Sequence, residues 1–297
     1  MQFRTISFKK KTKTLNYDII YELIVSLESE MEELIKKAEQ IKIIFFDIDD
    51  TLRVKTTAYM PDSITEVFEK LHQKGILTGI ATGRNLYGVV PEVKALNPDY
   101  FVTINGAFVM DAQKNVIFKN PYSKATVKEM MDWLEANHSE YAFVGSDELY
   151  VSQWNEIASS AIHPIYGTLK ENKNYYLNHD VYQMLSLSDH DDQIELTESL
   201  KQQIRMVRWH EYSSDLVPIH GSKADGCKKI LDRLDLKPEN MMNFGDELND
   251  RELFDLSGLS VAMKISHQEI LDKADYITET IENDGILKAL RALKIID

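Results

Sequence analysis

The pattern of apolar and polar positions changes character twice along the chain. Between residues 20 and 38, apolar side chains recur at alternating steps of four and three, with charged side chains between them. This spacing predicts an amphipathic helix, whose apolar stripe consists of Ile20, Ile24, Leu27, Met31, Leu34 and Ala38. The stripe is shorter than three heptads, which favours packing on its own domain over a dimer seam. A translation start at Met31 is a third interpretation.

From residue 41, short apolar runs alternate with helical patterns. Strands are expected at Ile41–Phe46, Ile76–Ala81, Tyr100–Ile104, Met241–Phe244 and Ser260–Met263. Helices are expected between and after them, at residues 61–71, 86–96, 223–234 and 250–256 and from Asp284 onward. Strands that alternate with helices predict an α/β fold with a parallel, Rossmann-like sheet. Ligands bind beyond the carboxyl ends of such strands, so the polar residues there are the candidates for chemistry.

The segment from residue 111 to 213 mixes short strands and helices in a different order. Strands are expected near residues 116–118, 141–144, 149–152, 181–187 and 205–209, and helices near 126–135, 154–162 and 193–203. This pattern predicts an α+β domain inserted into the first one. The expected organisation is an N-terminal helical extension at 1–40, a catalytic core at 41–110 and 214–297, and an inserted cap at 111–213.

Composition narrows the class of protein further. The chain has 34 Lys and Arg against 48 Asp and Glu, a formal net charge of −14, which argues against a nucleic-acid partner because that contact needs a basic surface. A single cysteine, Cys227, excludes an internal disulfide framework and a Cys-rich zinc site. No apolar run reaches the roughly 18 residues of a membrane span. Asp18 and Glu22 interrupt the segment that follows the basic N-terminus, unlike in a secretory signal, so a cytoplasmic protein is expected.

Two carboxylates follow the first expected strand, in the run Asp47-Ile48-Asp49-Asp50-Thr51. Asp47 and Asp49 are two residues apart, so in extended chain their side chains leave on the same face. Two carboxylates so placed repel each other unless a cation lies between or beside them, and a hard ion such as Mg²⁺ suits oxygen ligands. On its own the pattern also fits a solvated acidic strand end.

Three further polar clusters lie at strand–helix junctions. Ala81-Thr82-Gly83-Arg84 combines a hydroxyl, a glycine and free helix N–H groups, which suit an anion. Gly221-Ser222-Lys223 supplies a cation at the start of a helix, and the run from Gly245 to Asp250 adds acidic residues after a strand. Each alone is compatible with a helix cap, a surface lysine or a solvated turn. Their occurrence in this order favours one functional site.

Together these motifs resemble those of the haloacid dehalogenase-like (HAD) hydrolase superfamily, most of whose members are phosphatases. The resemblance covers residues 41–290 in four ordered motifs: Asp-x-Asp-x-Thr, the threonine of Ala-Thr-Gly-Arg, a lysine, and Gly-Asp-x-x-Asn-Asp. An insertion between the second and third motifs, preceded by Asn105-Gly106-Ala107, resembles the Cof-type branch with a C2 (type IIB) cap.

The resemblance implies a role for each motif residue. Asp47 would be the nucleophile that forms an aspartyl-phosphate, and Asp49 the general acid and then base. Mg²⁺ would be held by the Asp47 carboxylate, the Asp49 backbone carbonyl and Asp246. The phosphoryl oxygens would be held by Thr82, Gly83, Lys223 and Asn249. Asp250 would orient Lys223 or a metal-bound water rather than bind the metal itself. Arg84 would either contact the substrate or cap its helix, and the cap is the favoured interpretation.

Asp50 departs from the branch pattern, which usually has glycine at that position. Its backbone N–H could still face the phosphate, but its carboxylate must point away or be compensated, for which the turn Arg53–Lys55 is the candidate. The aspartate at position 49 also argues against dehalogenation, since the dehalogenases of the superfamily lack it and work without Mg²⁺.

The expected function is therefore a Mg²⁺-dependent phosphomonoesterase that acts on a small phosphorylated metabolite, as a monomer or homodimer. A phosphotransferase or mutase that uses the same aspartyl-phosphate is the alternative among enzymes. A non-enzymatic phosphoacceptor switch is the alternative outside them. The cap would select the leaving group; the candidate contacts are Tyr150, Trp154, His163, Tyr166, Tyr182, Arg205, Arg208 and Trp209.

Overall fold

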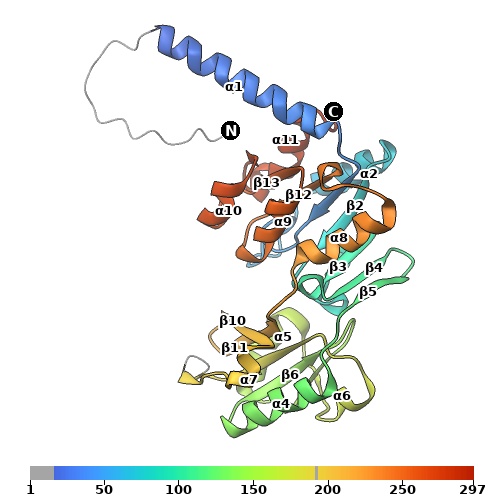
Figure 1. The fold of residues 1–297 in the computed structure, drawn as a ribbon, viewed down its shortest axis with the longest axis vertical. Coiled ribbons are helices and arrows are strands. Elements are labelled where there is room, and N and C mark those ends of the chain that lie inside the picture. Colours follow the sequence, from blue (N-terminus) through green and yellow to red (C-terminus); the bar gives the residue numbers. More distant parts are fainter. Residues whose placement is uncertain (1–16, 191–192) are drawn as a thin grey trace, which may run out of the picture. The chain divides into compact units, whose positions relative to one another are not determined.

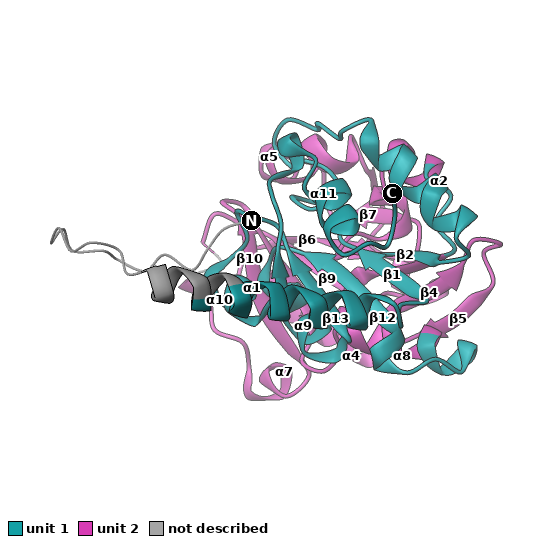
Figure 2. Ribbon diagram, turned by 90° about the horizontal axis from the view of Figure 1, so that it is seen from above, with its two compact units in different colours: residues 1–80, 96–99, 231–297 teal, residues 81–95, 100–230 magenta. Residues whose placement is uncertain are grey.

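The computed structural model describes residues 17–190 and 193–297, and the basic N-terminal stretch noted above lies outside them. The chain divides into two compact units (Figure 2). Unit 1 comprises residues 1–80, 96–99 and 231–297, and unit 2 comprises residues 81–95 and 100–230. The boundaries fall inside the second strand of the chain and inside the long helix α8 (Lys223–Leu234).

Unit 1 is built on five parallel strands in the order β14-β13-β12-β1-β2. They are β1 (Ile43–Phe46), β2 (Leu77–Ala81), β12 (Met241–Gly245), β13 (Leu259–Ala262) and β14 (Tyr276–Ile277). The helices of this unit are α1 (Tyr17–Ala38), α2 (Ser63–Gln73), α9 (Arg251–Leu256), α10 (Gln268–Lys273) and α11 (Gly285–Ala292). The predicted α/β class with a parallel sheet is confirmed.

Strand β1 lies between β12 and β2 in this sheet and is buried over its whole length. The Phe46 ring packs against Phe68 of α2 at 5.0 Å and against Phe244 of β12 at 5.2 Å between centroids. On the other side of β1, Phe45 lies opposite Gly79 of β2. A Cβ on Gly79 would lie 2.4 Å from the Phe45 ring. These aromatic contacts fix the strand whose next residue is Asp47.

The N-terminal helix α1 is anchored to unit 1 at its carboxyl end (Figure 1). Lys37 forms an ion pair with Asp275 at 2.8 Å, and Ala38 is buried. The described apolar residues of the predicted stripe, Leu27, Met31 and Leu34, are half-buried, while Val25 is 45% exposed. The helix predicted from the spacing is present, and the side chains of Ile20 and Ile24 lie outside the described part.

Unit 2 contains two groups of strands. The first is the antiparallel series β3 (Tyr100–Thr103), β4 (Phe108–Asp111) and β5 (Val116–Lys119). The second is a six-stranded sheet in the order β10-β11-β9-β6-β7-β8, antiparallel except for β7 and β8. Its strands are β6 (Glu140–Val144), β7 (Leu149–Val151), β8 (Lys170–Glu171), β9 (Gln183–Leu187), β10 (Ile204–His210) and β11 (Ser213–Pro218).

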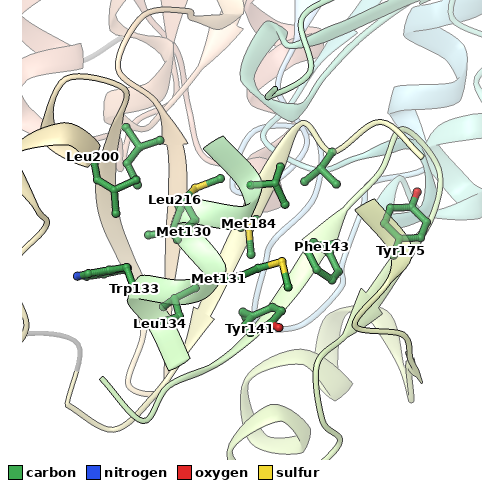
Figure 3. Close-up of a cluster of buried hydrophobic side chains, with 13 residues drawn as sticks. Met130, Met131, Trp133, Leu134, Tyr141, Phe143, Tyr175, Met184, Leu200 and Leu216 are labelled. Atoms are coloured by element: carbon green, nitrogen blue, oxygen red, sulfur yellow. The ribbon is translucent and has the colours of Figure 1, made fainter. Parts of the chain in front are cut away.

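Helices pack on the six-stranded sheet and give unit 2 its own core. They are α4 (Lys124–Ala136), α5 (Glu156–Tyr166), α6 (Tyr175–Asn178) and α7 (Glu198–Lys201). Figure 3 shows Met130, Met131 and Leu134 of α4 facing Tyr141, Phe143 and Met184 of the sheet. Tyr141 and Phe143 are two residues apart on β6, and Met184 of β9 pairs with Phe143, so these side chains lie on one face of the sheet.

Two predicted helices are wrong in extent. Residues 86–96 form a 3₁₀ turn at Leu86–Gly88 and a separate short helix, α3 (Pro91–Ala95). Pro91 has no N–H to continue the first turn but suits the first position of a new helix. In the predicted helix 193–203, only Glu198–Lys201 is α-helical, and it begins at Thr197, whose hydroxyl caps it.

The strand β11 was not predicted, and it pairs with β9 and β10 within the six-stranded sheet. The sheet therefore extends past residue 213, where the sequence placed the end of the insertion. Among residues 17–190 and 193–297, no helix combines the length and the apolarity that a membrane crossing needs.

Candidate active site

Three aspartates converge beyond the carboxyl ends of two neighbouring strands of unit 1. Asp47 follows β1, Asp246 follows β12, and Asp250 ends the 3₁₀ turn Leu248–Asp250 that precedes α9. One carboxylate oxygen from each lies within 4.8 Å of the other two. The residues are 7%, 9% and 0% exposed, respectively. Asp47 and Asp246 are two of the three predicted metal ligands, and Asp250 lies with them in this cluster.

Local contacts hold two of these carboxylates in place. The Thr51 hydroxyl, which is fully buried, donates to Asp246 Oδ1 at 2.7 Å. Asp250 Oδ2 accepts from the backbone N–H groups of Asp246 and Glu247, at 3.2 and 3.4 Å. Gly245 makes room for it, because a Cβ on Gly245 would lie 2.6 Å from the Asp250 carboxyl carbon.

The donor set suits a hard divalent cation. Three carboxylates removed from most solvent repel one another strongly unless an opposite charge compensates them. Oxygen donors alone, with no described histidine or cysteine in the cluster, match the preference of Mg²⁺ rather than Zn²⁺. The residues present thus fit the metal that the resemblance implies.

Asp49 and Asp50 lie outside this cluster. Asp49 is half-buried, and its backbone forms an isolated β-bridge with that of Arg53. Asp50 has a φ of 57°, a left-handed conformation that aspartate tolerates and that explains a preference for glycine. Its carboxylate accepts from the backbone N–H of Lys55 at 2.8 Å, a hydrogen bond from the turn that was expected to compensate its charge. Its own N–H donates to the Arg53 carbonyl at 2.7 Å rather than being free for a phosphate.

Unit 2 carries the second group of predicted residues. Thr82 is buried, and its backbone is bound on both sides, donating to Val102 and accepting from Asn105 at 2.9 and 3.1 Å. Gly83 faces the Asn105 amide, whose Oδ1 would lie 3.2 Å from a Cβ built there. Arg84 donates from its side chain to the Gly88 carbonyl at 2.8 Å, so its guanidinium supports the local turn.

The turn Ile104-Asn105-Gly106 connects this loop to Lys223. All three residues have positive φ values, 51°, 50° and 92°, and for a β-branched residue such as Ile104 this is a strained conformation. A Cβ on Gly106 would lie 2.0 Å from the Ser222 carbonyl oxygen, so only glycine lets the turn approach the start of α8. Lys223, the first residue of that helix, is fully buried.

The structure therefore brings the predicted residues together in two sets. Asp47 joins Asp246 in unit 1, where Asn249 precedes Asp250 in the same 3₁₀ turn. Thr82, Gly83 and Lys223 are connected in unit 2 through the turn 104–106.

No chemical role was predicted for three residues of the sequence motifs, Thr51, Asn105 and Gly106. Two features of the sequence could have indicated their importance. A threonine stood four residues after the nucleophile candidate, and an Asn-Gly pair followed a strand.

Known proteins resemble this chain over most of its length. The family model described as haloacid dehalogenase-like hydrolase matches residues 44–290. A Streptococcus pyogenes protein named a predicted bifunctional phosphatase/peptidyl-prolyl cis-trans isomerase is 48% identical over 272 residues, which are 91% of this chain. Those residues are 58% of that protein, so the chain spans little more than half of this relative's length.

Two further matches extend over the whole of the compared protein. The Bacillus subtilis protein YkrA, named a predicted phosphatase, is 30% identical over 264 residues, 86% of this chain and 98% of that one. A solved structure of a sugar phosphatase of HAD subclass IIB is 28% identical, with a TM-score of 0.74. That match covers 86% of this chain and 100% of the sugar phosphatase.

Proposed function

The chain belongs to the haloacid dehalogenase-like hydrolase family of phosphatases, and from that premise we propose that it hydrolyses the phosphomonoester of a small metabolite with Mg²⁺ bound. The family predicted from the sequence motifs is confirmed, and the subclass IIB neighbour agrees with the predicted branch. The observation that carries the proposal is the buried Asp47–Asp246–Asp250 cluster.

Asp47 is the proposed nucleophile. One of its carboxylate oxygens attacks phosphorus in line with the ester oxygen, so an Asp47–phosphorus bond forms while the ester bond breaks. Asp49 gives its proton to the departing alkoxide, and then accepts a proton from the water that attacks the aspartyl-phosphate. Inorganic phosphate leaves, and both aspartates return to their starting states.

The remaining motif residues would meet the charge of the phosphoryl group. The Thr82 hydroxyl, the Gly83 N–H and the Asn249 side chain are donors for its oxygens, and the buried Lys223 supplies a positive charge. Donors aimed at a transferring phosphoryl group act more strongly in a site that excludes water. The strained turn 104–106 supports this assignment, because it fixes both the Thr82 backbone and the start of α8.

The metal would be held by Asp47, the Asp49 backbone carbonyl and Asp246. When bound, Mg²⁺ neutralises charge on the phosphoryl oxygens and orients the group for attack. Asp250, expected to orient Lys223 or a water, lies close enough to the other two carboxylates to contribute directly or through water.

The proposed organisation remains a core with an inserted cap, now extended to residue 218 to include β11. The 28% identical relative is a sugar phosphatase, which supports a sugar phosphate as the first substrate to test. The cytoplasmic location and the monomeric or dimeric state stay predictions.

Hydrolysis of p-nitrophenyl phosphate tests the proposal. We expect the wild-type protein to release p-nitrophenol with Mg²⁺, and both EDTA and Asp47→Asn to abolish turnover, because nucleophile and metal are each required. Asp232→Asn, on the exposed part of α8, is the matched control and should retain activity. Full activity in EDTA or in Asp47→Asn would contradict the mechanism.

Product analysis separates the two enzymatic alternatives. Adding a high concentration of glycerol should leave phosphate release nearly equal to p-nitrophenol release if water is the natural acceptor. A phosphotransferase would instead release less phosphate than phenol, since the aspartyl-phosphate would partition to the alcohol.

A further inference from the structure

The segment that follows Thr82-Gly83-Arg84 is tied to a turn some sixty residues away within unit 2. Asn85 Nδ2 donates to the backbone carbonyls of Gly145 and Glu148, at 3.0 and 3.2 Å. The next backbone N–H, that of Leu86, donates to the Ser146 carbonyl at 2.9 Å. Three hydrogen bonds therefore join two consecutive residues to the β6–β7 turn (residues 145–148).

The other half of the Asn85 amide stabilises its own loop. Its Oδ1 accepts from Gly88 N–H at 3.1 Å and caps the turn Leu86–Gly88. The residue is 0% exposed, and both polar atoms of its amide are hydrogen-bonded. A buried side chain that binds groups on two segments at once cannot be removed without losing hydrogen bonds to both segments.

The β6–β7 turn is itself fixed to the six-stranded sheet. Gly145 N–H donates to the Glu148 carbonyl at 2.9 Å, and Val144, which precedes the turn, accepts from Tyr182 N–H at 2.9 Å. A Cβ on Gly145 would lie 2.2 Å from the Tyr175 hydroxyl, so the turn packs directly on that ring. Any shift of this end of the sheet would therefore move the carbonyls that Asn85 binds.

A nearby contact reinforces this connection. The Tyr87 ring stacks on Tyr166 of α5 at 6.4 Å between centroids, and Gly88 allows the Tyr166 ring to approach its backbone. Burial and the neighbouring Glu148 charge raise the pKa of Tyr175, so its phenol stays neutral at physiological pH. Hydrogen bonds to backbone carbonyls and an aromatic pair thus connect the loop to the sheet and the α5 helix.

We propose that Asn85 is a positioning residue that couples the β6–β7 turn to the loop Thr82–Arg84, so that occupancy of that loop by a phosphoryl group orders the turn. This inference rests on the proposed function, in which Thr82 and Gly83 bind the phosphoryl oxygens. Coupling is reciprocal, so a leaving group that orders the turn also holds the loop in its phosphate-binding form. Asn85 then affects substrates with large leaving groups more than small ones.

Hydrogen exchange of the intact protein, with and without inorganic phosphate and Mg²⁺, tests the coupling. In the wild-type protein, phosphate should slow exchange in residues 82–88 and also in 145–148, by about tenfold. In Asn85→Ala, phosphate should slow exchange only in the first segment. Asn85→Asp keeps the acceptor for Gly88 N–H but loses both donors, so it should also uncouple the turn and provides a second variant if the first folds poorly.

The matched control is Asn240→Ala in unit 1. The Asn240 amide also bridges two backbone segments, donating to Gln40 and accepting from Lys237 at 3.0 and 3.1 Å. That variant should keep the phosphate-dependent protection of 145–148. In steady-state assays, Asn85→Ala should lower kcat/KM for a hexose phosphate more than for acetyl phosphate, and Asn240→Ala should change their ratio by less than twofold (about the error of such ratios).

Three outcomes would overturn the coupling. Phosphate that protects 82–88 but not 145–148 in the wild-type protein, or equal protection in Asn85→Ala, contradicts the coupling and leaves the proposed phosphatase intact. Phosphate that protects neither segment contradicts both the coupling and the phosphoryl site. Hydrolysis by wild-type protein and its loss in Asp47→Asn test the proposed function separately.

Discussion

A threonine hydroxyl within the acidic motif holds one carboxylate of the candidate metal site. Thr51 is fully buried, and its Oγ1 donates to Asp246 Oδ1 at 2.7 Å. A ligand carboxylate that loses such a partner is free to rotate, and loss of an outer partner commonly weakens metal binding by 10- to 100-fold. Thr51→Val removes the hydroxyl while nearly preserving the side-chain volume. We expect this variant to bind Mg²⁺ at least about tenfold more weakly, as measured by calorimetric titration.

Thr51→Ser is the control for this prediction. It retains the hydroxyl and loses only a methyl group, so its affinity for Mg²⁺ should stay within about threefold of the wild-type value. Equal Mg²⁺ affinity in the valine variant would show that the hydrogen bond does not determine how Asp246 is oriented.

Two glycines with positive φ provide a second test at the residue scale. Gly75 has a φ of 70° and open space around it, so Gly75→Ala should cost only the left-handed strain of about 1–2 kcal/mol. Gly106 has a φ of 92°, and its new Cβ would also meet the Ser222 carbonyl at 2.0 Å. Gly106→Ala should therefore lower the free energy of unfolding, measured in urea, by clearly more than Gly75→Ala. Equal costs would contradict the close approach of the turn to α8.

At the scale of elements, the hydrophobic pattern predicted the position of a helix or strand correctly where its local conformational preference agreed with its tertiary packing. Helix α8 has the bounds that the sequence predicted, and β1 and β12 lie where apolar runs end in acidic residues. The pattern failed at residues 86–96, where apolar spacing continued across Pro91 although the backbone could not.

The hydrophobic pattern also could not predict which strands pair when they lie far apart in the sequence. Nothing in residues 213–218 alone indicates that they pair with both β9 and β10. The same limit applies to the candidate site, since each motif residue could be named but the Asn85–Gly145 bond joins residues 60 positions apart. Such contacts depend on the tertiary fold rather than on local spacing.

At the scale of the whole molecule, the two units divide the candidate chemistry between them. The candidate metal-binding carboxylates belong to unit 1, and the Thr82 loop, Lys223 and the six-stranded sheet belong to unit 2. The chain connects these sets through β2, which runs parallel to β1 and continues into Thr82.

The N-terminal helix is the part of the molecule least connected to this chemistry. Its carboxyl end is attached to unit 1 through the exposed Lys37–Asp275 pair, and surface ion pairs contribute only about 0–1 kcal/mol. Deleting residues 1–38 should therefore shift the thermal midpoint of unfolding by only a few degrees and leave p-nitrophenyl phosphate hydrolysis intact. Light scattering should show a mass reduced only by the deleted residues, because the helix is anchored to its own chain.

Lys37→Ala should reproduce most of the thermal shift, and the matched control Lys36→Ala, on the exposed side of the same turn, should not. A change from dimer to monomer on deletion would show instead that α1 forms an interface between two copies.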